Sequence, residues 1–280
     1  MILVTGAAGN VGGELVRALA DAGEPVRALV RALPKEGGPG QFPPGAETVA
    51  GDLNEPASLR PALDGTDGVF LLPGYADMSG VLAEARRAGV RAVVQLSGMS
   101  AASGDLSNAI TAYMASSEQA ARESGLAWTI LRPAMFMSNT FQWLPQLRAG
   151  DVVSAPFGHV RAAVTDPADI AAVAALALTA QGHEGRVYEL SGPEPLTAAG
   201  RVAILGQVLA RDLRFEAQAD EDARAEMSAT TPARYVDAFF DFYVTGTLDE
   251  SRVLPTVREL TGRPPGTFSQ WAAAHAAAFR

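Results

Sequence analysis

The fold of this chain is decided near its start by the stretch Gly6-Ala7-Ala8-Gly9-Asn10-Val11-Gly12. The apolar run before it, residues 2–5, predicts a buried strand, and the helical spacing of apolar residues over 11–22 predicts a helix. The first glycine permits a sharp turn, the second lets a pyrophosphate approach the backbone, and the third lets the helix pack closely on the strand. The stretch therefore predicts the opening of a dinucleotide-binding fold. The alternative is a tight strand–helix turn that binds no ligand.

The alternation of strand and helix continues through the first half of the chain. Five more strands are expected, at residues 25–31, 47–50, 68–72, 90–96 and 128–131. Helical patterns separate most of them, at residues 56–63, 81–88 and 110–124. Apolar runs without alternation, joined by helices, are typical of parallel strands covered on both faces. We therefore expect an α/β fold with a Rossmann-type doubly wound parallel sheet.

The pattern changes after Arg132-Pro133. Short strands are expected at residues 151–155, 161–164, 186–190 and 213–215, and helices at residues 167–180, 198–209, 220–227, 232–244 and 268–279. We expect residues 1–150 to form an NAD(P)-binding Rossmann domain. Residues 151–280 are expected to form a smaller, interleaved C-terminal α/β lobe that binds the substrate. A Gly/Pro-rich loop is expected at residues 34–45.

The composition excludes several kinds of protein. Of the 280 residues 48% are hydrophobic and 19% charged, which is typical of a soluble globular protein. The net charge of −9 argues against binding to nucleic acid or to an anionic membrane. Cysteine is absent, and His159, His183 and His275 lack ligand spacing, so neither disulfides nor a metal site are expected. With no basic leader and no apolar run of about 20 residues, a cytoplasmic location is expected.

Two residues at predicted strand ends bear on the choice of nucleotide. Arg31 ends the second strand, where an acidic residue would hold the adenosine ribose hydroxyls. An arginine there suits a 2′-phosphate instead, which favours NADPH over NADH; the alternative is a solvated arginine at the rim. Asp52 follows the third strand and is expected either to accept a hydrogen bond from the adenine amino group or to form a turn.

Several segments together resemble a known family. They are 5–12, Val30-Arg31, Gly51-Asp52-Leu53, Leu96-Ser97-Gly98, 125–133, 166–171 and 188–193. This set is similar to the atypical short-chain dehydrogenases of the NmrA-like group, and the resemblance spans nearly the whole chain. That group includes NADPH-dependent quinone reductases, triphenylmethane-dye reductases and redox-sensing regulators.

The resemblance implies that NADP(H) is the cofactor. The glycine loop would bind the pyrophosphate, Arg31 the 2′-phosphate, and the segments after the fourth, fifth and sixth strands the rest of the dinucleotide. The implied cofactor residues are Gly6, Ala8, Gly9, Asn10, Val11, Gly12, Arg31, Asp52, Leu53, Leu72, Pro73, Ser97, Gly98, Pro133 and Phe136.

One departure from the wider superfamily limits the chemistry. Its dehydrogenases use a Tyr-x-x-x-Lys pair on the helix after the fifth strand, where the lysine lowers the pKa of the tyrosine. Here Ser117 stands in the lysine position if Tyr113 is the tyrosine; in the other register Ile110 and Met114 fill the two positions. Reduction of a quinone needs no strong acid, because its phenolate product can take a proton from water or from a weak donor such as Ser100 or Tyr113.

The expected substrate is a small molecule, flat and apolar. Met99, Met137 and Asn139 are predicted to contact it, in a pocket whose further candidates are Ser100, Tyr113, Phe136, Phe141 and Trp143. The alternative is that the aromatic and methionine residues belong to the core. A second aromatic cluster, Tyr235, Phe239, Phe240, Phe242 and Tyr243, is expected to pack the lobe or to form a homodimer surface.

Three functions therefore remain open. The first is an NADPH-dependent reductase of quinones or similar conjugated electrophiles. The second is a non-catalytic NADP(H)-sensing regulator, and the third is a tailoring enzyme of secondary metabolism on the same scaffold. An open apolar pocket beside the nicotinamide would separate the first two, because only the reductase needs one. A regulator is expected to carry a partner-binding extension, and the chain has no long appended tail, which favours the reductase.

Overall fold

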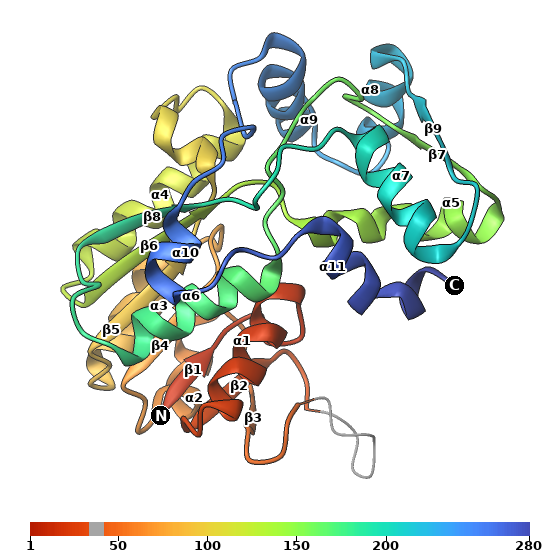
Figure 1. Ribbon diagram of the computed structural model, residues 1–280. Coiled ribbons are helices and arrows are strands. Elements are labelled where there is room, and N and C mark those ends of the chain that lie inside the picture. Colours follow the sequence, from red (N-terminus) through yellow and green to blue (C-terminus); the bar gives the residue numbers. More distant parts are fainter. Residues whose placement is uncertain (34–41) are drawn as a thin grey trace. The chain divides into compact units, whose positions relative to one another are not determined.

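The computed structural model describes residues 1–33 and 42–280 (Figure 1). Residues 34–41 of the predicted Gly/Pro-rich loop lie outside the described residues. The chain divides into two compact units. The first consists of Met1–Ala101, Tyr113–Arg132 and Pro167–Glu189, and the second of Ala102–Ala112, Pro133–Asp166 and Leu190–Arg280. The chain thus passes between the units several times.

A seven-stranded sheet forms the centre of the first unit, in the order β3-β2-β1-β4-β5-β6-β8. Its strands are β1 (Ile2–Val4), β2 (Val26–Val30), β3 (Glu47–Ala50), β4 (Gly68–Leu71), β5 (Ala92–Leu96), β6 (Ala127–Pro133) and β8 (Arg186–Leu190). The pairings from β3 through β6 are parallel. This order, which reverses direction between β1 and β4, is that of a doubly wound dinucleotide-binding sheet. The predicted fold class is confirmed, and β8 adds a seventh strand to the six expected.

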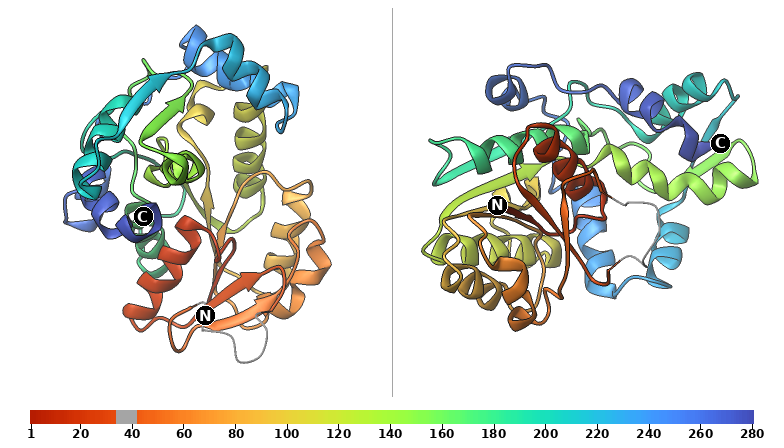
Figure 2. Two further views of the ribbon diagram at one scale, coloured as in Figure 1. Left: turned by 90° about the vertical axis from the view of Figure 1, so that its right-hand side faces the viewer. Right: turned by 90° about the horizontal axis from the view of Figure 1, so that it is seen from below.

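Helices cover both faces of this sheet (Figure 2, right). They are α1 (Asn10–Asp21), α2 (Arg60–Leu63), α3 (Met78–Arg87), α4 (Ala109–Glu123) and α6 (Pro167–Thr179), with short 3-10 turns η1 (Pro56–Leu59) and η2 (Met99–Ser103). Helix α6 comes from the second half of the sequence yet packs against α1. On the opposite face Leu3 and Val69 of the sheet share a buried cluster with Leu82 of α3. Burial of these apolar side chains drives the layers together.

A buried carboxylate ties α4 to the ends of two strands. Glu118 accepts hydrogen bonds from the Ser97 hydroxyl (2.7 Å), from Nε and Nη2 of Arg132 (both 2.7 Å) and from Nη2 of Arg122 (2.9 Å). The Glu118 side chain is only 4% exposed. Because both of its oxygens are fully engaged, the charge is tolerated in the interior, and β5, β6 and α4 are held in one register.

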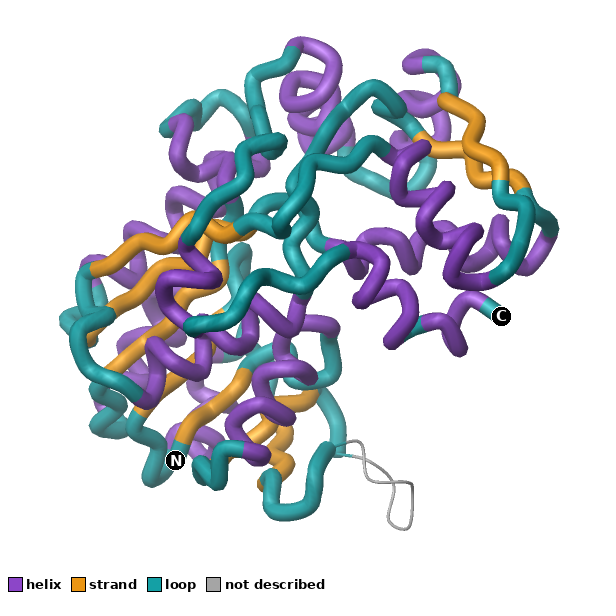
Figure 3. Tube along the Cα trace, in the orientation of Figure 1, coloured by secondary structure: helices purple, strands orange, loops and turns teal. Residues whose placement is uncertain are grey.

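The second unit contains a two-stranded parallel sheet of β7 (Val152–Ala155) and β9 (Arg214–Ala217), visible as a separate pair in Figure 3. Its helices are α5 (Leu144–Ala149), α7 (Ala198–Leu209), α8 (Asp220–Ser228), α9 (Ala233–Phe240), α10 (Thr256–Thr261) and α11 (Phe268–Ala274), with short turns η3 (Met137–Trp143), η4 (Asp241–Thr245) and η5 (Ala276–Phe279). Val153, Leu205 and Trp271 belong to its main buried cluster. Among the expected elements, the helix over 232–244 appears as α9 followed by the π-helical turn η4.

Two expectations for the second unit are wrong. The strand predicted at residues 161–164 does not form; Ala162 makes only an isolated bridge with Leu196. The segment is buried, but no neighbouring strand runs along it among the described residues, so burial alone explains its apolar run. The helix predicted over 268–279 breaks at His275, whose ring Nδ1 lies 2.8 Å from the Trp271 carbonyl oxygen.

Within the described part of the chain, no helix combines the length and the apolar character needed to cross a bilayer. The same residues contain no group of three histidine, aspartate or glutamate side chains placed to hold a metal ion.

Replacing Glu118 by alanine is expected to destabilise the first unit strongly. The change leaves the Arg132 guanidinium, 16% exposed, without its carboxylate. Loss of one partner of a buried ion pair costs roughly 3–5 kcal/mol. Urea denaturation should therefore show a lower free energy of unfolding. The control Glu123→Ala removes an exposed carboxylate from the same helix and should change that free energy by less than about 0.5 kcal/mol. Equal losses in both variants would contradict the assigned role of Glu118.

Candidate functional site

The loop between β1 and α1 requires glycine at its first position. Gly6 adopts a φ of +61°, a left-handed conformation that glycine adopts without strain. A Cβ at this residue would lie 2.4 Å from Cδ1 of Leu72. The Gly6 carbonyl oxygen accepts a hydrogen bond from the Gly9 nitrogen at 2.9 Å, which closes the turn. The first glycine of the motif therefore has the role that its position predicts.

The start of α1 lies very close to this turn. A Cβ on Gly12 would be 2.2 Å from the Gly6 carbonyl oxygen, so only glycine allows the approach. The helix begins at Asn10 with Gly9 as its extended N-cap, and no side chain among the described residues caps it. Its first-turn amides therefore remain available as donors, and the helix dipole adds partial positive charge. This geometry fits the diphosphate of a dinucleotide.

The segment after β4 links the glycine loop to α4. The Leu72 nitrogen donates to the Thr5 hydroxyl at 3.1 Å, and the Gly74 nitrogen donates to the Ser117 hydroxyl at 3.0 Å. A Cβ on Gly74 would lie 3.3 Å from the ring of Tyr113. The structure thus brings the predicted residues Leu72 and Tyr113, and with them Pro73, to the same end of the sheet as the glycine loop.

The ends of β2 and β3 carry the two residues expected near the adenosine. Arg31 directly follows β2 and is exposed. Asp52 forms a turn: its Oδ1 accepts hydrogen bonds from the Asn54 nitrogen at 2.9 Å and from Asn54 Nδ2 at 3.1 Å. Burial raises the pKa of the Tyr75 phenol, while the charge of Arg31 lowers it and that of Asp52 raises it further. Arg31 and Asp52 therefore both lie within electrostatic reach of the Tyr75 phenol. Leu53, the next cofactor candidate, is buried.

Among the candidates after β5, Ser97 makes a contact that stabilises the fold. Ser97 is buried, and its hydroxyl donates to Glu118. Gly98 and Met99 are half-buried, and Ser100 is buried in η2. Four residues after Tyr113, the Ser117 hydroxyl donates to the Tyr113 carbonyl oxygen at 2.8 Å. If Tyr113 is the tyrosine of the expected pair, the lysine position is filled by Ser117, whose side chain ties α4 to the loop after β4.

The remaining candidates belong to the second unit. Pro133 ends β6, Phe136 bridges to Thr165, and Met137 is 1% exposed within the main buried cluster. Phe141, one of the pocket alternatives, packs on Trp271 with ring centroids 5.1 Å apart. For Met137 and Phe141, the structure matches the core alternative.

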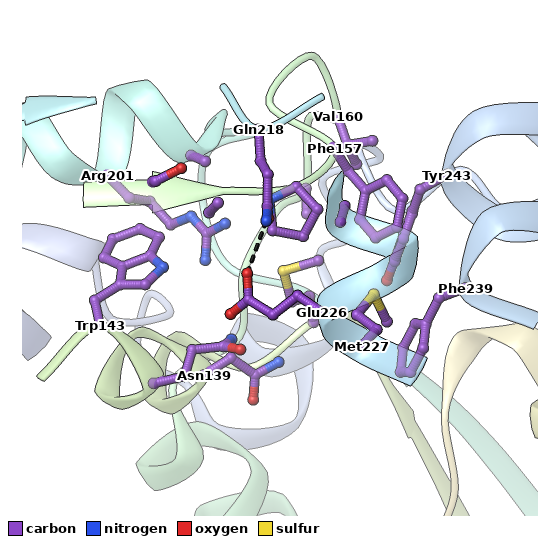
Figure 4. Close-up of a pocket in the computed structure, with 18 of the residues that line it drawn as sticks. Asn139, Trp143, Phe157, Val160, Arg201, Gln218, Glu226, Met227, Phe239 and Tyr243 are labelled. Atoms are coloured by element: carbon purple, nitrogen blue, oxygen red, sulfur yellow. Dashed lines mark hydrogen bonds between the residues drawn. The ribbon is translucent and has the colours of Figure 1, made fainter. Parts of the chain in front are cut away.

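A pocket of about 750 Å³ lies within the second unit (Figure 4). Its size is within the range of roughly 300–1,000 Å³ that is usual for small-molecule sites. Its apolar wall includes Met135, Trp143, Phe157, Met227, Phe239 and Tyr243, and its polar lining includes Asn139, Gln142, Gln146, Arg201, Gln218 and Glu226. Of the predicted substrate residues, Asn139 lines this pocket, as does Trp143 from the wider set.

The aromatic cluster near the C-terminus contributes to the same pocket. Tyr243 donates its hydroxyl to Oε2 of Glu250 at 3.0 Å, and Oε1 of Glu250 accepts from the Met135 nitrogen at 2.8 Å. Burial raises the pKa of both the phenol and the carboxyl group. Phe157, at a φ of +54°, lies with its ring centroid 5.3 Å from that of Tyr243. Sequence reasoning missed Arg201, Gln218 and Glu226, because no local motif marks them.

Replacing Gly12 by alanine is expected to weaken dinucleotide binding by at least about tenfold, since the added Cβ forces α1 away from the turn that aims its amides. Isothermal titration with NADPH measures the change. Gly13→Ala is the matched control, because its Cβ would meet the nearest atom at 3.3 Å and needs only a small adjustment. An unchanged dissociation constant in the folded Gly12→Ala protein would contradict the assigned geometry.

Comparison with known proteins agrees with this geometry. A family model described as NAD(P)H-binding matches residues 6–181. The (4-alkanoyl-5-oxo-2,5-dihydrofuran-3-yl)methyl phosphate reductase of Streptomyces griseus is 46% identical, over 100% of this chain and 99% of that protein. The NAD(P)H azoreductase of Xenophilus azovorans is 38% identical, over 100% of this chain and 99% of that protein.

A solved structure shares both fold and length with the chain. The NADPH-dependent quinone oxidoreductase of Escherichia coli, in complex with NADPH, superposes with a TM-score of 0.77 at 25% identity, covering 98% of this chain and 99% of that one. The resemblance noted from the sequence motifs is confirmed, and so is the cofactor class that it implied. The chain belongs to the NAD(P)H-binding family, as a member of its NAD(P)H-dependent reductases.

Proposed function

We propose that this protein is an NADPH-dependent reductase that transfers a hydride to a flat conjugated electrophile of the quinone type. One combination of features carries the proposal. The N-terminus of α1, which follows the glycine loop, has no side-chain cap among the described residues, and helix α4 contains no lysine. The loop supports binding of the dinucleotide. The missing lysine restricts the acceptors to those whose reduced product is a stabilised anion.

The names of the related proteins support an acceptor of this kind. They refer to an acylated furanone phosphate, to azo compounds and to quinones. In each, an electron-poor double bond is conjugated to further unsaturated groups, so charge that develops on reduction is delocalised. Such an acceptor needs position and electrostatic support from the protein more than it needs a strong acid.

The residues of the first unit would hold the cofactor as follows. The first-turn amides of α1 would bind the diphosphate, and Arg31 the 2′-phosphate. When bound, the reduced nicotinamide supplies one hydride, which with one proton converts a quinone to the hydroquinone. Tyr113 and Ser100 carry hydroxyls that can supply this proton, and water can do the same.

The pocket of the second unit would receive the substrate. Its aromatic and methionine side chains suit a flat apolar molecule, and Asn139 offers a side-chain amide for a carbonyl oxygen. This proposal keeps the predicted substrate role of residues 151–280 only in part, because the pocket is also lined by residues before 151, among them Met135 and the predicted Asn139 and Trp143.

The central experiment mixes the protein with NADPH and a panel of acceptors and follows the absorbance of the reduced nicotinamide. We expect oxidation of NADPH that depends on naphthoquinone or an azo dye, and none with cyclohexanone, a ketone whose reduction yields an unstabilised alkoxide. Tight binding of NADPH without oxidation by any acceptor would contradict the proposal and favour a nucleotide-sensing regulator. Rapid reduction of cyclohexanone would contradict the argument from the missing lysine.

Replacing Arg31 by alanine should change the cofactor preference. Loss of a charged hydrogen bond to the 2′-phosphate is expected to raise the KM for NADPH roughly tenfold or more, and to leave the KM for NADH nearly unchanged. Arg17→Ala is the control, because Arg17 is exposed on α1 and pairs with Glu14. If both cofactors lose equally, Arg31 does not face the 2′-phosphate.

A further inference from the structure

The pocket of the second unit contains a buried cation with no ion-pair or side-chain hydrogen-bond partner among the described residues. Arg201 belongs to α7 and is 8% exposed. Neither an ion pair nor a side-chain hydrogen bond joins its guanidinium to another described residue, and its Nε is fully buried without a partner. A buried charge left unpaired is costly to a fold. A side chain kept in this state inside a pocket therefore points to a ligand that completes it.

The guanidinium has a defined position and charge. It lies over the indole of Trp143, 5.2 Å from the ring centroid, and points into the pocket (Figure 4). Burial lowers its pKa to about 10, so it remains protonated at neutral pH. The contact with Trp143 holds one face of the planar group and leaves its N–H edge free to donate.

The described carboxylates near Arg201 form no ion pair with it. The charge of Glu250 acts on Arg201 electrostatically, but no ion pair joins the two side chains; the oxygens of Glu250 accept hydrogen bonds from the Met135 nitrogen and the Tyr243 hydroxyl instead. Glu226 is the one carboxylate among the described residues that line the pocket. It is exposed and accepts a hydrogen bond from Gln218 Nε2 at 2.7 Å, drawn as the dashed line in Figure 4.

The rest of the wall is suited to an apolar ring. Met135, Phe157, Phe239 and Tyr243 line the same cavity as Arg201. The pocket thus offers an apolar and aromatic surface together with a positively charged guanidinium of defined position. A guanidinium binds phosphate or carboxylate through two parallel hydrogen bonds, which a neutral ring substituent cannot form.

We propose that Arg201 binds an anionic substituent, a phosphate monoester or a carboxylate, carried by the flat acceptor. This inference rests on the proposed use of the pocket for the substrate. It narrows the substrate class from any conjugated electrophile to one with an acidic group, and it makes Arg201 a specificity-determining residue.

The test measures binding of compounds that cannot be reduced. Naphthyl phosphate, naphthoate and naphthol are titrated calorimetrically into the full-length protein with NADP⁺ present in excess, which keeps the probes out of the nucleotide site. We expect at least one of the two anions to bind about tenfold or more tightly than naphthol, and the stronger anion identifies the acidic group. Arg201→Gln should abolish this preference and Arg201→Lys should restore part of it. Arg258→Gln, which removes an exposed arginine outside the pocket, should leave it intact.

A second variant tests the inference without touching the buried arginine. Glu226→Gln removes the like charge beside the expected anion and should tighten binding of the anion by a fewfold, with naphthol unchanged. A preference for anions that persists in Arg201→Gln would overturn the inference, as would equal binding of naphthol and both anions to the unmodified protein. If the protein binds the anions through Arg201 but oxidises no NADPH, the proposed reductase function fails and the anion site stands.

Discussion

The close approach of α1 to the turn before it is the constraint on which both the fold and the nucleotide site depend. A Cβ at residue 12 would lie 2.2 Å from the Gly6 carbonyl oxygen, so the helix and the turn meet through main-chain atoms alone. The same contact fixes the helix axis and leaves the uncapped amides of its first turn at the carboxyl end of β1. The packing of α1 and the binding of the ligand therefore have the same cause, which is the absence of side chains at Gly6 and Gly12.

Much of the first unit was predictable because its signals are local. Apart from β3, which carries Glu47 and Thr48, the strands from β1 to β6 are short, mostly apolar runs between turn residues, and parallel order follows from the helices that join such strands. What the local pattern could not provide is the pairing of distant segments. Residues 186–190 were expected in the smaller lobe but join the main sheet as β8, and α6 packs on α1 although some 150 residues separate them. The run at 161–164 has the composition of a strand, but a strand requires a neighbour, and none runs along it within the described residues.

The residues of the candidate site differ in the same way: some are marked by a local pattern, and others depend on contacts between distant segments. Glycine positions could be assigned from the sequence because the backbone geometry they permit is set within seven residues. The carboxylate of Glu118 could not, since its partners Ser97 and Arg132 come from two other elements and meet it only in the folded sheet. The position of Arg201 is even harder to predict from the sequence. In the sequence it resembles the many solvated arginines of the chain, and only the packing around α7 buries it over Trp143. Met137 illustrates the opposite difficulty: the sequence left it open whether this methionine lines a pocket or belongs to the core, and in the structure it is buried in the main cluster of the second unit.

The two proposed anion sites use different physical means, and this has a consequence for how the protein family can vary. The glycine loop would hold a diphosphate by main-chain amides, so its affinity is insensitive to most side-chain changes but is lost if a Cβ intrudes. Arg201 would hold an anion by one side chain, and replacing that residue removes the interaction without disturbing the sheet or α1. On the proposed assignment, cofactor binding depends on the fold itself, whereas the choice of substrate would change with single substitutions in the second unit. If the proposed site is right, relatives that share the NAD(P)H-binding segment would differ in acceptor through residues of this second kind, which fits the differing names of the furanone phosphate reductase, the azoreductase and the quinone oxidoreductase.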